Sequence, residues 1–284
     1  MNKLDPRRHA YRDDLAAEAL HGLVEAPRYA APSPMQVTRS AVPLRRGPDG
    51  SLAYETELLA GEIFDVYAVE NGFAWGQARR DSDLGYCPEA ALGPLQSPPT
   101  HRVSTLRSFL YPGPGMKATP LDYLPYGAEV AVAGSEGEYA RTPLGYLYAA
   151  HLEPLDIHAV DPVAEAERFV GVPYLWGGKS SLGIDCSGLV QTACFACGIA
   201  APRDSDMQEA ELGSPLPLPN DPTQLPRGAL LFWSGHVALS QGGGRMIHAN
   251  AFHMQVVSED IAPALVRIAS KGSGLRLARL LPGL

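Results

Sequence analysis

A cysteine at a predicted helix start is the residue of this chain most able to do covalent chemistry. Cys186 follows Gly183 and Asp185, and the helix that begins at Asp185 or Cys186 should end at Gly198. Unpaired backbone N–H groups and the positive end of the helix dipole favour a thiolate there, and the thiolate is the nucleophile of a cysteine hydrolase. Position alone equally allows a small buried core residue, because cysteine is commonly buried.

Two histidines could supply the base that such a nucleophile needs. His236 and His248 lie on successive predicted strands joined by Gly242-Gly243-Gly244. A three-residue turn pairs His236 with Asn250, which puts both imidazoles on one face, about 7–8 Å apart at the backbone. A two-residue turn would instead place them on opposite faces. On the first geometry, Asn250 shares their face and is a rival group for orienting His236.

The elements that must position these residues form a helix-then-strand pattern. Asp161-Pro162 is a helix start, and that helix should end near Val170, before Gly171. The helix after Asp185 has one apolar face. Strand-like runs follow at 229–233, 236–241, 245–250, 254–258 and 275–280. Helices followed by an antiparallel meander are typical of an α+β fold.

The first half of the chain has a different pattern of predicted secondary structure. Residues 1–35 predict a short helix, about Asp13 to Val24, and then a Pro-rich connector. Short runs rich in Val, Tyr, Phe and Ala follow, bounded by Gly and Pro, which indicate strands of small barrels. A weak repeat supports two such units, because residues 84–92 match residues 144–152 sixty positions later.

Composition excludes several classes of protein. The chain has 284 residues, 45% of them hydrophobic, with 23 Lys+Arg against 31 Asp+Glu and a net charge of −8. It has no basic run, which argues against a phosphate-tracking nucleic-acid binder, and no window near the ~20 apolar residues of a membrane helix. Its first residues lack the apolar region of a secretory signal, and four cysteines do not make a disulfide framework. We therefore expect a cytoplasmic protein.

Four motifs together resemble the NlpC-type (papain-like) cell-wall cysteine peptidases. They are Pro-Tyr-Leu-Trp-Gly-Gly at 173–178, Asp-Cys-Ser-Gly-Leu-Val at 185–190, Gly-His-Val-Ala-Leu at 235–239 and Arg-Met-Ile-His-Ala at 245–249. The resemblance covers about residues 162–258. The upstream repeats are similar to the bacterial SH3-like (SH3b) domains that such enzymes often carry.

The resemblance implies an α+β fold, a papain-like cysteine peptidase domain preceded by two small all-β SH3-like barrels. We expect the N-terminal helix and connector at 1–35, the first SH3-like domain at 36–98, the second at 99–157 and the peptidase domain at 158–284.

The resemblance also implies catalytic roles. Cys186 is the nucleophile, His236 the general base and acid, and His248 the group that orients His236. The hydroxyl of Tyr174 and the backbone N–H of Cys186 stabilise the oxyanion. A helix N-terminus and a nearby imidazole should lower the pKa of the Cys186 thiol. This chemistry calls for neither a metal nor a cofactor.

Substrate residues are implied in the same way. The segment 202–208 resembles the pocket that binds the free α-amine of L-Ala, so Asp204 and Ser205 should hold that amine. Asp185, Ser187 and Trp176 should line the groove. The expected reaction is hydrolysis of the γ-D-glutamyl–diamino acid bond in murein peptides such as L-Ala-γ-D-Glu-diaminopimelate. Asp204 could instead be a helix or turn cap.

Other interpretations stay open at the level of sequence. Cys194 and Cys197 form a C-x-x-C two turns inside a helix, which favours a buried face over a redox or zinc site. A non-catalytic binder of wall fragments, a general wall hydrolase or amidase, and an acyltransferase are alternative functions. We expect a monomer that recycles murein peptides in the cytoplasm and binds neither nucleic acid nor membrane.

Overall fold

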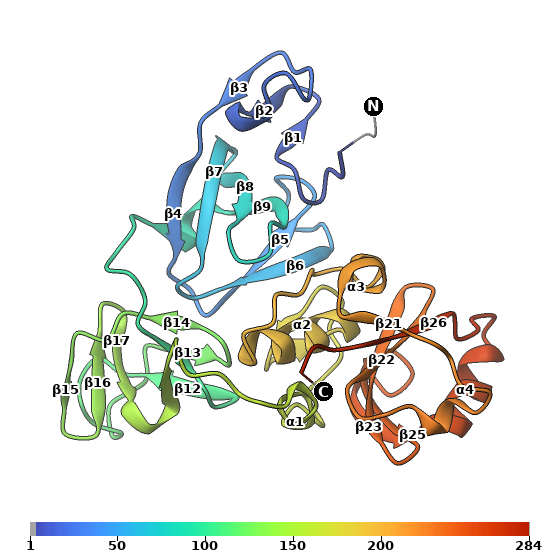
Figure 1. The fold of residues 1–284 in the computed structure, drawn as a ribbon. Helices are drawn as coiled ribbons and strands as arrows, with labels where there is room; N and C mark the ends of the chain where they lie inside the picture. Colours follow the sequence, from blue (N-terminus) through green and yellow to red (C-terminus); the bar gives the residue numbers. More distant parts are fainter. Residues whose placement is uncertain (1–3, 284) are drawn as a thin grey trace. The chain divides into compact units, whose positions relative to one another are not determined.

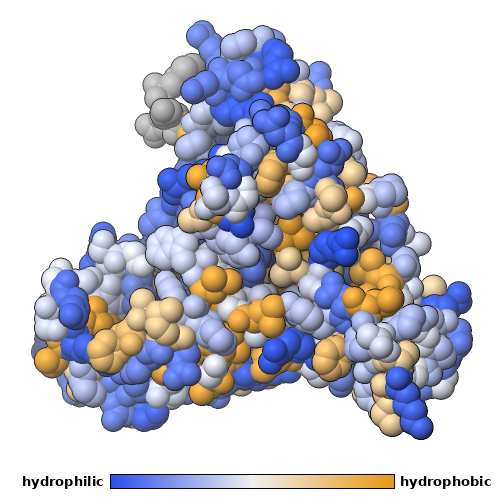
Figure 2. All heavy atoms as spheres, turned by 180° about the vertical axis from the view of Figure 1, so that it is seen from behind, coloured by the Kyte–Doolittle hydropathy of each residue, from blue (hydrophilic) through white to orange (hydrophobic). Residues whose placement is uncertain are grey.

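The computed structural model describes residues 4–283 of the chain, which divides into two compact units, Met1–Leu155 and Asp156–Leu284. Figure 1 shows strands throughout the first unit and a mixture of helices and strands in the second. Among the described residues, no helix is both long enough and apolar enough to cross a membrane. On the face drawn in Figure 2, hydrophobic and hydrophilic residues are interspersed.

The first unit contains a seven-stranded sheet with the order β10-β4-β7-β8-β9-β5-β6. Its elements are β4 (Ser33–Val37), β5 (Ala41–Arg45), β6 (Tyr54–Leu59), β7 (Ile63–Glu70), β8 (Phe73–Ala78), β9 (Leu84–Pro88), the 3-10 turn η2 (Glu89–Ala91) and β10 (Leu92–Gly93). Alternate side chains such as Val42 and Leu44 on β5 and Phe64 and Val66 on β7 pack in its core.

The N-terminal segment is not the helix that we expected at about Asp13 to Val24. It forms β1 (Tyr11–Arg12), β2 (Leu15–Ala17), the 3-10 turn η1 (Glu18–Leu20) and β3 (Tyr29–Ala30). Asp13 and Asp14 make the tight turn between β1 and β2, as short polar residues favour turns. Leu15 then packs against Trp75 of the seven-stranded sheet. Burial against that sheet outweighs local helix propensity.

Three smaller sheets complete the first unit. Their elements are β11 (His101–Val103), β12 (Arg107–Leu110), β13 (Asp122–Pro125), β14 (Glu129–Val130), β15 (Gly134–Glu136), β16 (Tyr139–Thr142), β17 (Gly145–Tyr148), η3 (Ala149–His151) and β18 (Leu152–Pro154). The two copies of the repeated sequence, residues 84–92 and 144–152, adopt the same local structure. Each forms a strand, a 3-10 turn and a second strand, which are β9-η2-β10 in the first copy and β17-η3-β18 in the second.

The second unit is built on a six-stranded sheet with the order β21-β26-β22-β23-β24-β25. Its strands are β21 (Ser214–Leu216), β22 (Ala229–Trp233), β23 (His236–Gly242), β24 (Arg245–Asn250), β25 (Gln255–Asp260) and β26 (Leu277–Leu280), beside the short pair β19 (Lys179–Ser180) and β20 (Gly183–Ile184). Its helices are α1 (Pro162–Glu167), α2 (Cys186–Ala196), α3 (Ser205–Glu211), the 3-10 turn η4 (Pro222–Gln224) and α4 (Ile261–Ala269). Helix α2 packs against β23 and β24, which brings its N-terminus to the histidine strands.

The β23–β24 hairpin keeps the predicted register with a different turn. Leu239 pairs with Ile247, as the prediction requires, but Gly242 pairs with Arg245. The turn therefore has two residues, Gly243 and Gly244, rather than three, and a bulge lies between Ser240 and Gly242. The extra residue of the bulge offsets the shorter turn, so His236 and His248 still share a face. Both turn glycines have positive φ, 60° and 78°, as this kind of hairpin turn requires.

Candidate active site

Cys186 is the first residue of α2, as the sequence predicts. Asp185 caps the helix by accepting a 2.7 Å hydrogen bond from the backbone N–H of Gly188. The thiol is 7% exposed, and the backbone N–H of Val237 on β23 donates to it. The candidate nucleophile Cys186 therefore contacts β23 at Val237, the residue that directly follows His236.

The pKa of the thiol is not lowered in the free protein, contrary to our expectation. Burial, followed by the negative charge of Asp185, raises the pKa of Cys186 to about 12. The N–H donors and the Arg203 charge act in the opposite direction but are weaker. The free-energy cost of burying a thiolate exceeds the stabilisation that the N–H donors and Arg203 give to it. Cys186 is therefore a neutral thiol in the free protein.

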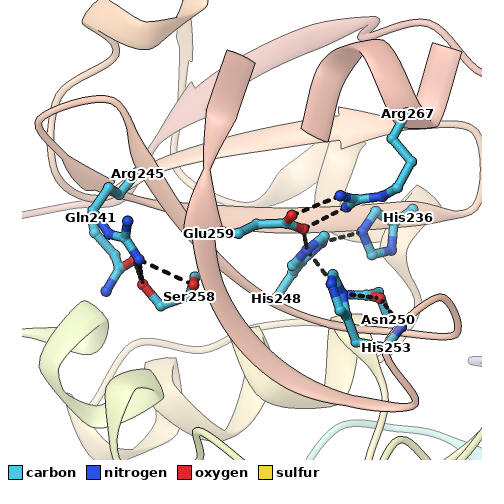
Figure 3. Close-up of polar contacts among 9 residues, drawn as sticks. All are labelled: His236, Gln241, Arg245, His248, Asn250, His253, Ser258, Glu259 and Arg267. Carbon is cyan, nitrogen blue, oxygen red and sulfur yellow. Dashed lines mark hydrogen bonds and ion pairs between the residues drawn. The ribbon is translucent and has the colours of Figure 1, made fainter. Parts of the chain in front are cut away.

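The two histidines are in direct contact, as the hairpin register predicts. Nε2 of His236 lies 2.8 Å from Nδ1 of His248, and the ring centroids are 5.0 Å apart. Figure 3 shows the two rings approaching each other from neighbouring strands. His248 is 1% exposed, so its imidazole is surrounded by protein atoms and is shielded from solvent.

Glu259 on β25 completes this chain of contacts and was missed by the sequence reasoning. Its Oε1 lies 2.7 Å from Nε2 of His248, while Arg267 on α4 forms an ion pair with both of its oxygens (Figure 3). Register could have found it, because His248 pairs with Val257 and Glu259 is two residues further on, on the same face. We expected that strand to end at Ser258.

The Glu259 carboxylate determines which ring nitrogens carry protons. Burial pushes its pKa up, but hydrogen bonds from His248 and Arg267 outweigh burial and lower the pKa to about 2. An ionised carboxylate only accepts, so Nε2 of His248 donates to it, and Nδ1 of His248 accepts from Nε2–H of His236. This assignment leaves Nδ1 of His236 as the basic nitrogen.

Asn250, the rival orienting group, also contacts this chain. Its Nδ2 lies 2.9 Å from Nε2 of His248, and its Oδ1 accepts from the backbone N–H of His253. Because Nε2 of His248 carries the hydrogen that it donates to Glu259, it offers no acceptor to the Asn250 amide; Asn250 lies beside His248 and does not take its place next to His236.

Both imidazoles are neutral in the free protein. Burial, together with the neighbouring His248, lowers the pKa of His236 to about 3. Burial is also the largest cause of the lowered pKa of His248, although the Glu259 carboxylate opposes it. A neutral His236 can accept the proton of the Cys186 thiol.

Tyr174 lies close to the nucleophile. Its backbone N–H donates to the carbonyl of Met254, and its side chain is half-buried. Burial, followed by the charges of Cys186 and Asp185, raises the pKa of its phenol. The hydroxyl therefore stays protonated and can act as a donor, which is what the expected oxyanion role requires.

Asp185 and Ser187, two of the predicted groove residues, are tied into a buried network. Arg203 donates to both Asp185 oxygens at 3.0 and 2.7 Å and to Oγ of Ser187 at 2.9 Å. Arg203 is 2% exposed, and Asp185 also accepts from the N–H of Gly177. Nothing in the spacing of the sequence singled out Arg203, whose partners lie 16 and 18 residues away.

The other predicted substrate residues lie on adjoining segments. Asp204 and Ser205 begin α3, directly after Arg203, so the Arg203–Asp185 contact ties this segment to the start of α2. Asp204 is the N-cap residue, but its carboxylate caps none of the N–H groups of α3. Trp176 is 66% exposed.

The C-x-x-C motif lies apart from this chemistry. Cys194 is buried on α2, where burial raises its pKa to about 12, and Cys197 is the C-cap residue of that helix. Within residues 4–283, no group of three or more His, Cys, Asp or Glu side chains could hold a metal ion.

Comparison with known proteins identifies two domains. Residues 171–266 match the NlpC/P60 family, and residues 44–92 match the bacterial dipeptidyl-peptidase Sh3 domain. A γ-D-glutamyl-L-lysine dipeptidyl-peptidase from Bacillus subtilis (strain 168) is 31% identical over 52% of this chain and 52% of its own length. Dipeptidyl-peptidase 6 from Lysinibacillus sphaericus is 34% identical over 47% of this chain and 55% of its own. The chain thus aligns with about half the length of these curated relatives.

A solved structure agrees with the fold. The crystal structure of an NlpC/P60 family protein from Bacillus cereus superposes with a TM-score of 0.74, over 88% of this chain and 100% of that one, at 22% identity. The papain-like α+β architecture follows from this likeness together with the sheet and helices described above. The chain therefore contains an NlpC/P60 domain at residues 171–266, with a bacterial SH3 domain ahead of it at residues 44–92.

Proposed function

We propose that this chain is a cysteine peptidase that hydrolyses the γ-D-glutamyl–diamino acid bond of murein peptides with a free N-terminal L-Ala. The supporting observation is the buried thiol at the start of α2, beside a strand whose His236 is hydrogen-bonded to His248 and, through it, to Glu259. The names of the relatives support a cell-wall peptidase of the NlpC/P60 type.

Acylation begins from the neutral pair. Nδ1 of His236 takes the proton of the Cys186 thiol as the sulfur attacks the γ-carbonyl carbon of D-Glu. The resulting imidazolium is stabilised through His248 by the Glu259 carboxylate. Tyr174 and the backbone N–H of Cys186 are the proposed donors to the oxyanion. The C–N bond then breaks, and His236 gives its proton to the leaving amine.

Deacylation reverses the proton transfers. Water attacks the thioester carbonyl while His236 takes one of its protons. The C–S bond breaks, the γ-carboxyl group of the L-Ala-D-Glu product is formed, and the sulfur recovers the proton from His236. One peptide bond and one water molecule are consumed in each turnover.

The requirement for a free amine is the finer part of the proposal. Asp204 is placed at the start of α3 by its neighbour Arg203, whose buried ion pair with Asp185 holds that segment to the nucleophile helix. A carboxylate there can pair with the α-ammonium of L-Ala. Such a requirement suits peptides already released from the wall, so we propose a role in murein-peptide recycling in the cytoplasm.

The proposal is tested by incubating the protein with L-Ala-γ-D-Glu-diaminopimelate, with its N-acetylated counterpart and with intact wall, and detecting products by mass spectrometry. We expect L-Ala-D-Glu from the free peptide alone, and no turnover by Cys186→Ala. Asp204→Ala should chiefly raise KM for the free peptide, by about tenfold, since it removes a charge-assisted contact.

The outcomes separate the alternatives. Cleavage of intact wall would indicate a general wall hydrolase, and equal loss on the N-acetylated peptide would remove the role of Asp204. Absence of cleavage, with all three substrates still bound, would indicate a non-catalytic wall-fragment binder.

A further inference from the structure

A bidentate ion pair lies at the ring nitrogen of His248 that faces away from His236. Arg267 on α4 donates to Oε2 of Glu259 at 2.7 Å and to Oε1 of the same carboxylate at 2.5 Å. Oε1 of Glu259 also lies 2.7 Å from Nε2 of His248, so both oxygens of the carboxylate are engaged (Figure 3). The proposed mechanism uses this carboxylate but gives no role to the guanidinium of Arg267.

Packing holds the guanidinium in place. The Phe252 ring lies 4.6 Å from it, and Ile261 and Ala264 anchor α4 in the hydrophobic core of the second unit. The side chains of Arg267 and Glu259 are both partly buried, so water screens their charges less than it would at the surface. The ion pair is therefore a fixed feature of the surroundings of His248.

The two members of the ion pair act in opposite directions on the histidine pair, His236 and His248. Burial is the largest cause of the lowered pKa of each histidine. Among the charges, the Glu259 carboxylate acts to raise both pKa values, and the Arg267 guanidinium acts to lower them. Without its cation, the carboxylate would favour a protonated histidine pair, and a protonated His236 cannot accept a proton from a thiol.

Other titratable groups surround the histidine pair on the elements packed against it. They are Cys186 on α2, Glu165 and Glu167 on α1, His253 in the loop after β24 and Lys271 after α4. Cys186 is a neutral thiol, and each of the two glutamates forms an ion pair with an arginine. Within residues 4–283, Arg267 is the only arginine or lysine that forms an ion pair with Glu259. The charge of Glu259 is therefore balanced by Arg267.

We propose that Arg267 is a positioning residue, which holds the Glu259 carboxylate against His248 and balances its charge, so that the histidine pair carries no charge until Cys186 gives up its proton. This inference rests on the proposed function. The carboxylate still accepts from Nε2–H of His248 and so fixes the tautomer of that ring. Arg267 prevents the same carboxylate from protonating His236 before substrate binds.

The first test measures the charge of the histidine pair in the full chain without substrate. The probe is the imidazole 15N resonances of His236 and His248 from pH 4 to 8, assigned with His236→Asn and His248→Asn. Both rings should be neutral at pH 7 in the native chain. In Arg267→Met the protonation midpoint should rise by about one pH unit or more, because an unbalanced carboxylate favours the charged form. Adding Glu259→Gln to Arg267→Met removes both charges and should reverse this rise.

The second test measures kcat/KM on L-Ala-γ-D-Glu-diaminopimelate over the same pH range. A base that protonates at higher pH is lost sooner as the pH falls, so the acidic limb of Arg267→Met should move to higher pH by the same amount. Arg267→Lys keeps the charge but not the bidentate geometry. It should therefore retain the native position of the limb with a lower plateau kcat.

Arg245→Met is the matched control. Arg245 on β24 pairs at 2.8 Å with Asp260, the neighbour of Glu259 on β25, and both side chains of this second ion pair are exposed (Figure 3). Its removal should change neither the 15N resonances nor the limb. Unchanged resonances in Arg267→Met, or a lower plateau without movement of the limb, would overturn the role of Arg267. A native chain that cleaves no peptide would instead overturn the proposed function, while the resonances would still test the charge balance.

Discussion

Burial governs the protonation of Cys186 and His236, the proposed nucleophile and base, since it is the largest cause of both pKa shifts. The pKa of Cys186 is raised to about 12 and that of His236 is lowered to about 3. The free protein therefore holds a thiol and an imidazole rather than a thiolate and an imidazolium. In the proposed mechanism, His248 and Glu259 stabilise the positive charge that His236 gains when it accepts the proton of Cys186.

This protonation state predicts the pH dependence of activity. Because the folded pKa of His236 lies below its ordinary 6.5, the imidazole stays neutral as the pH falls through 6.5. The acidic limb of kcat/KM should therefore lie below pH 5, with a plateau through neutral pH. The measurement is kcat/KM on L-Ala-γ-D-Glu-diaminopimelate from pH 4 to 9, with samples returned to pH 7 to verify that the protein survives. A limb centred near pH 6.5 would contradict a desolvated His236.

At the scale of elements, three contacts fix the position of the start of α2. Asp185 caps the helix, Arg203 pairs with Asp185, and Gly188 lets the helix approach the backbone of the preceding loop. A Cβ on Gly188 would lie 2.3 Å from the carbonyl oxygen of Gly178 and 3.0 Å from Oδ1 of Asp185. The helix terminus that carries Cys186 cannot move away without breaking the capping contacts.

Gly188→Ala should therefore destabilise the chain, although alanine favours a helix by about 1 kcal/mol over glycine. Overpacking against backbone should leave a net loss of about 1–3 kcal/mol, with lower kcat because Cys186 shifts. The matched control is Gly274→Ala, where a Cβ would meet nothing within 4 Å. Urea unfolding and kcat of both variants are the measurements, and equal stability of the two would refute the close-packing argument.

At the scale of the whole molecule, each unit has its own core and its own buried ion pair. In the first unit, Arg80 lies 3.2 Å from Glu62, which is almost fully buried, and also pairs with Glu129. In the second unit, Arg203 pairs with Asp185. Removing one partner of a buried pair leaves the other charge without compensation.

Two matched substitutions should consequently affect two different transitions. Arg80→Met should lower the thermal transition of the first unit, and Arg203→Met that of the second, each by about 3 kcal/mol or roughly 10 °C. Differential scanning calorimetry of the intact chain and both variants is the measurement. A single transition that both variants shift equally would show that the two units unfold together.

The sequence by itself determined the features that depend on local spacing. The helix was predicted to begin at Asp185 or Cys186, and it begins at Cys186 because Asp185 caps it through a short-range hydrogen bond. The contact of His236 with His248 follows from strand alternation across one hairpin, and the four motifs between residues 173 and 249 indicated the NlpC/P60 domain that is matched at residues 171–266. The predicted turn length was wrong, but the predicted pairing of the strands was still correct, because the bulge before Gly242 compensates for the shorter turn.

Tertiary structure alone decided what depends on packing between distant segments. Residues 11–17 became a hairpin because Leu15 and Ala17 are buried in the cluster that contains Trp75, which no local propensity reports. Arg203 and Glu259 reach their partners only after α3 and β25 are in place. The neutral state of Cys186 and His236 also depends on tertiary packing. Their desolvation is caused by many atoms from distant segments, which local spacing in the sequence does not describe.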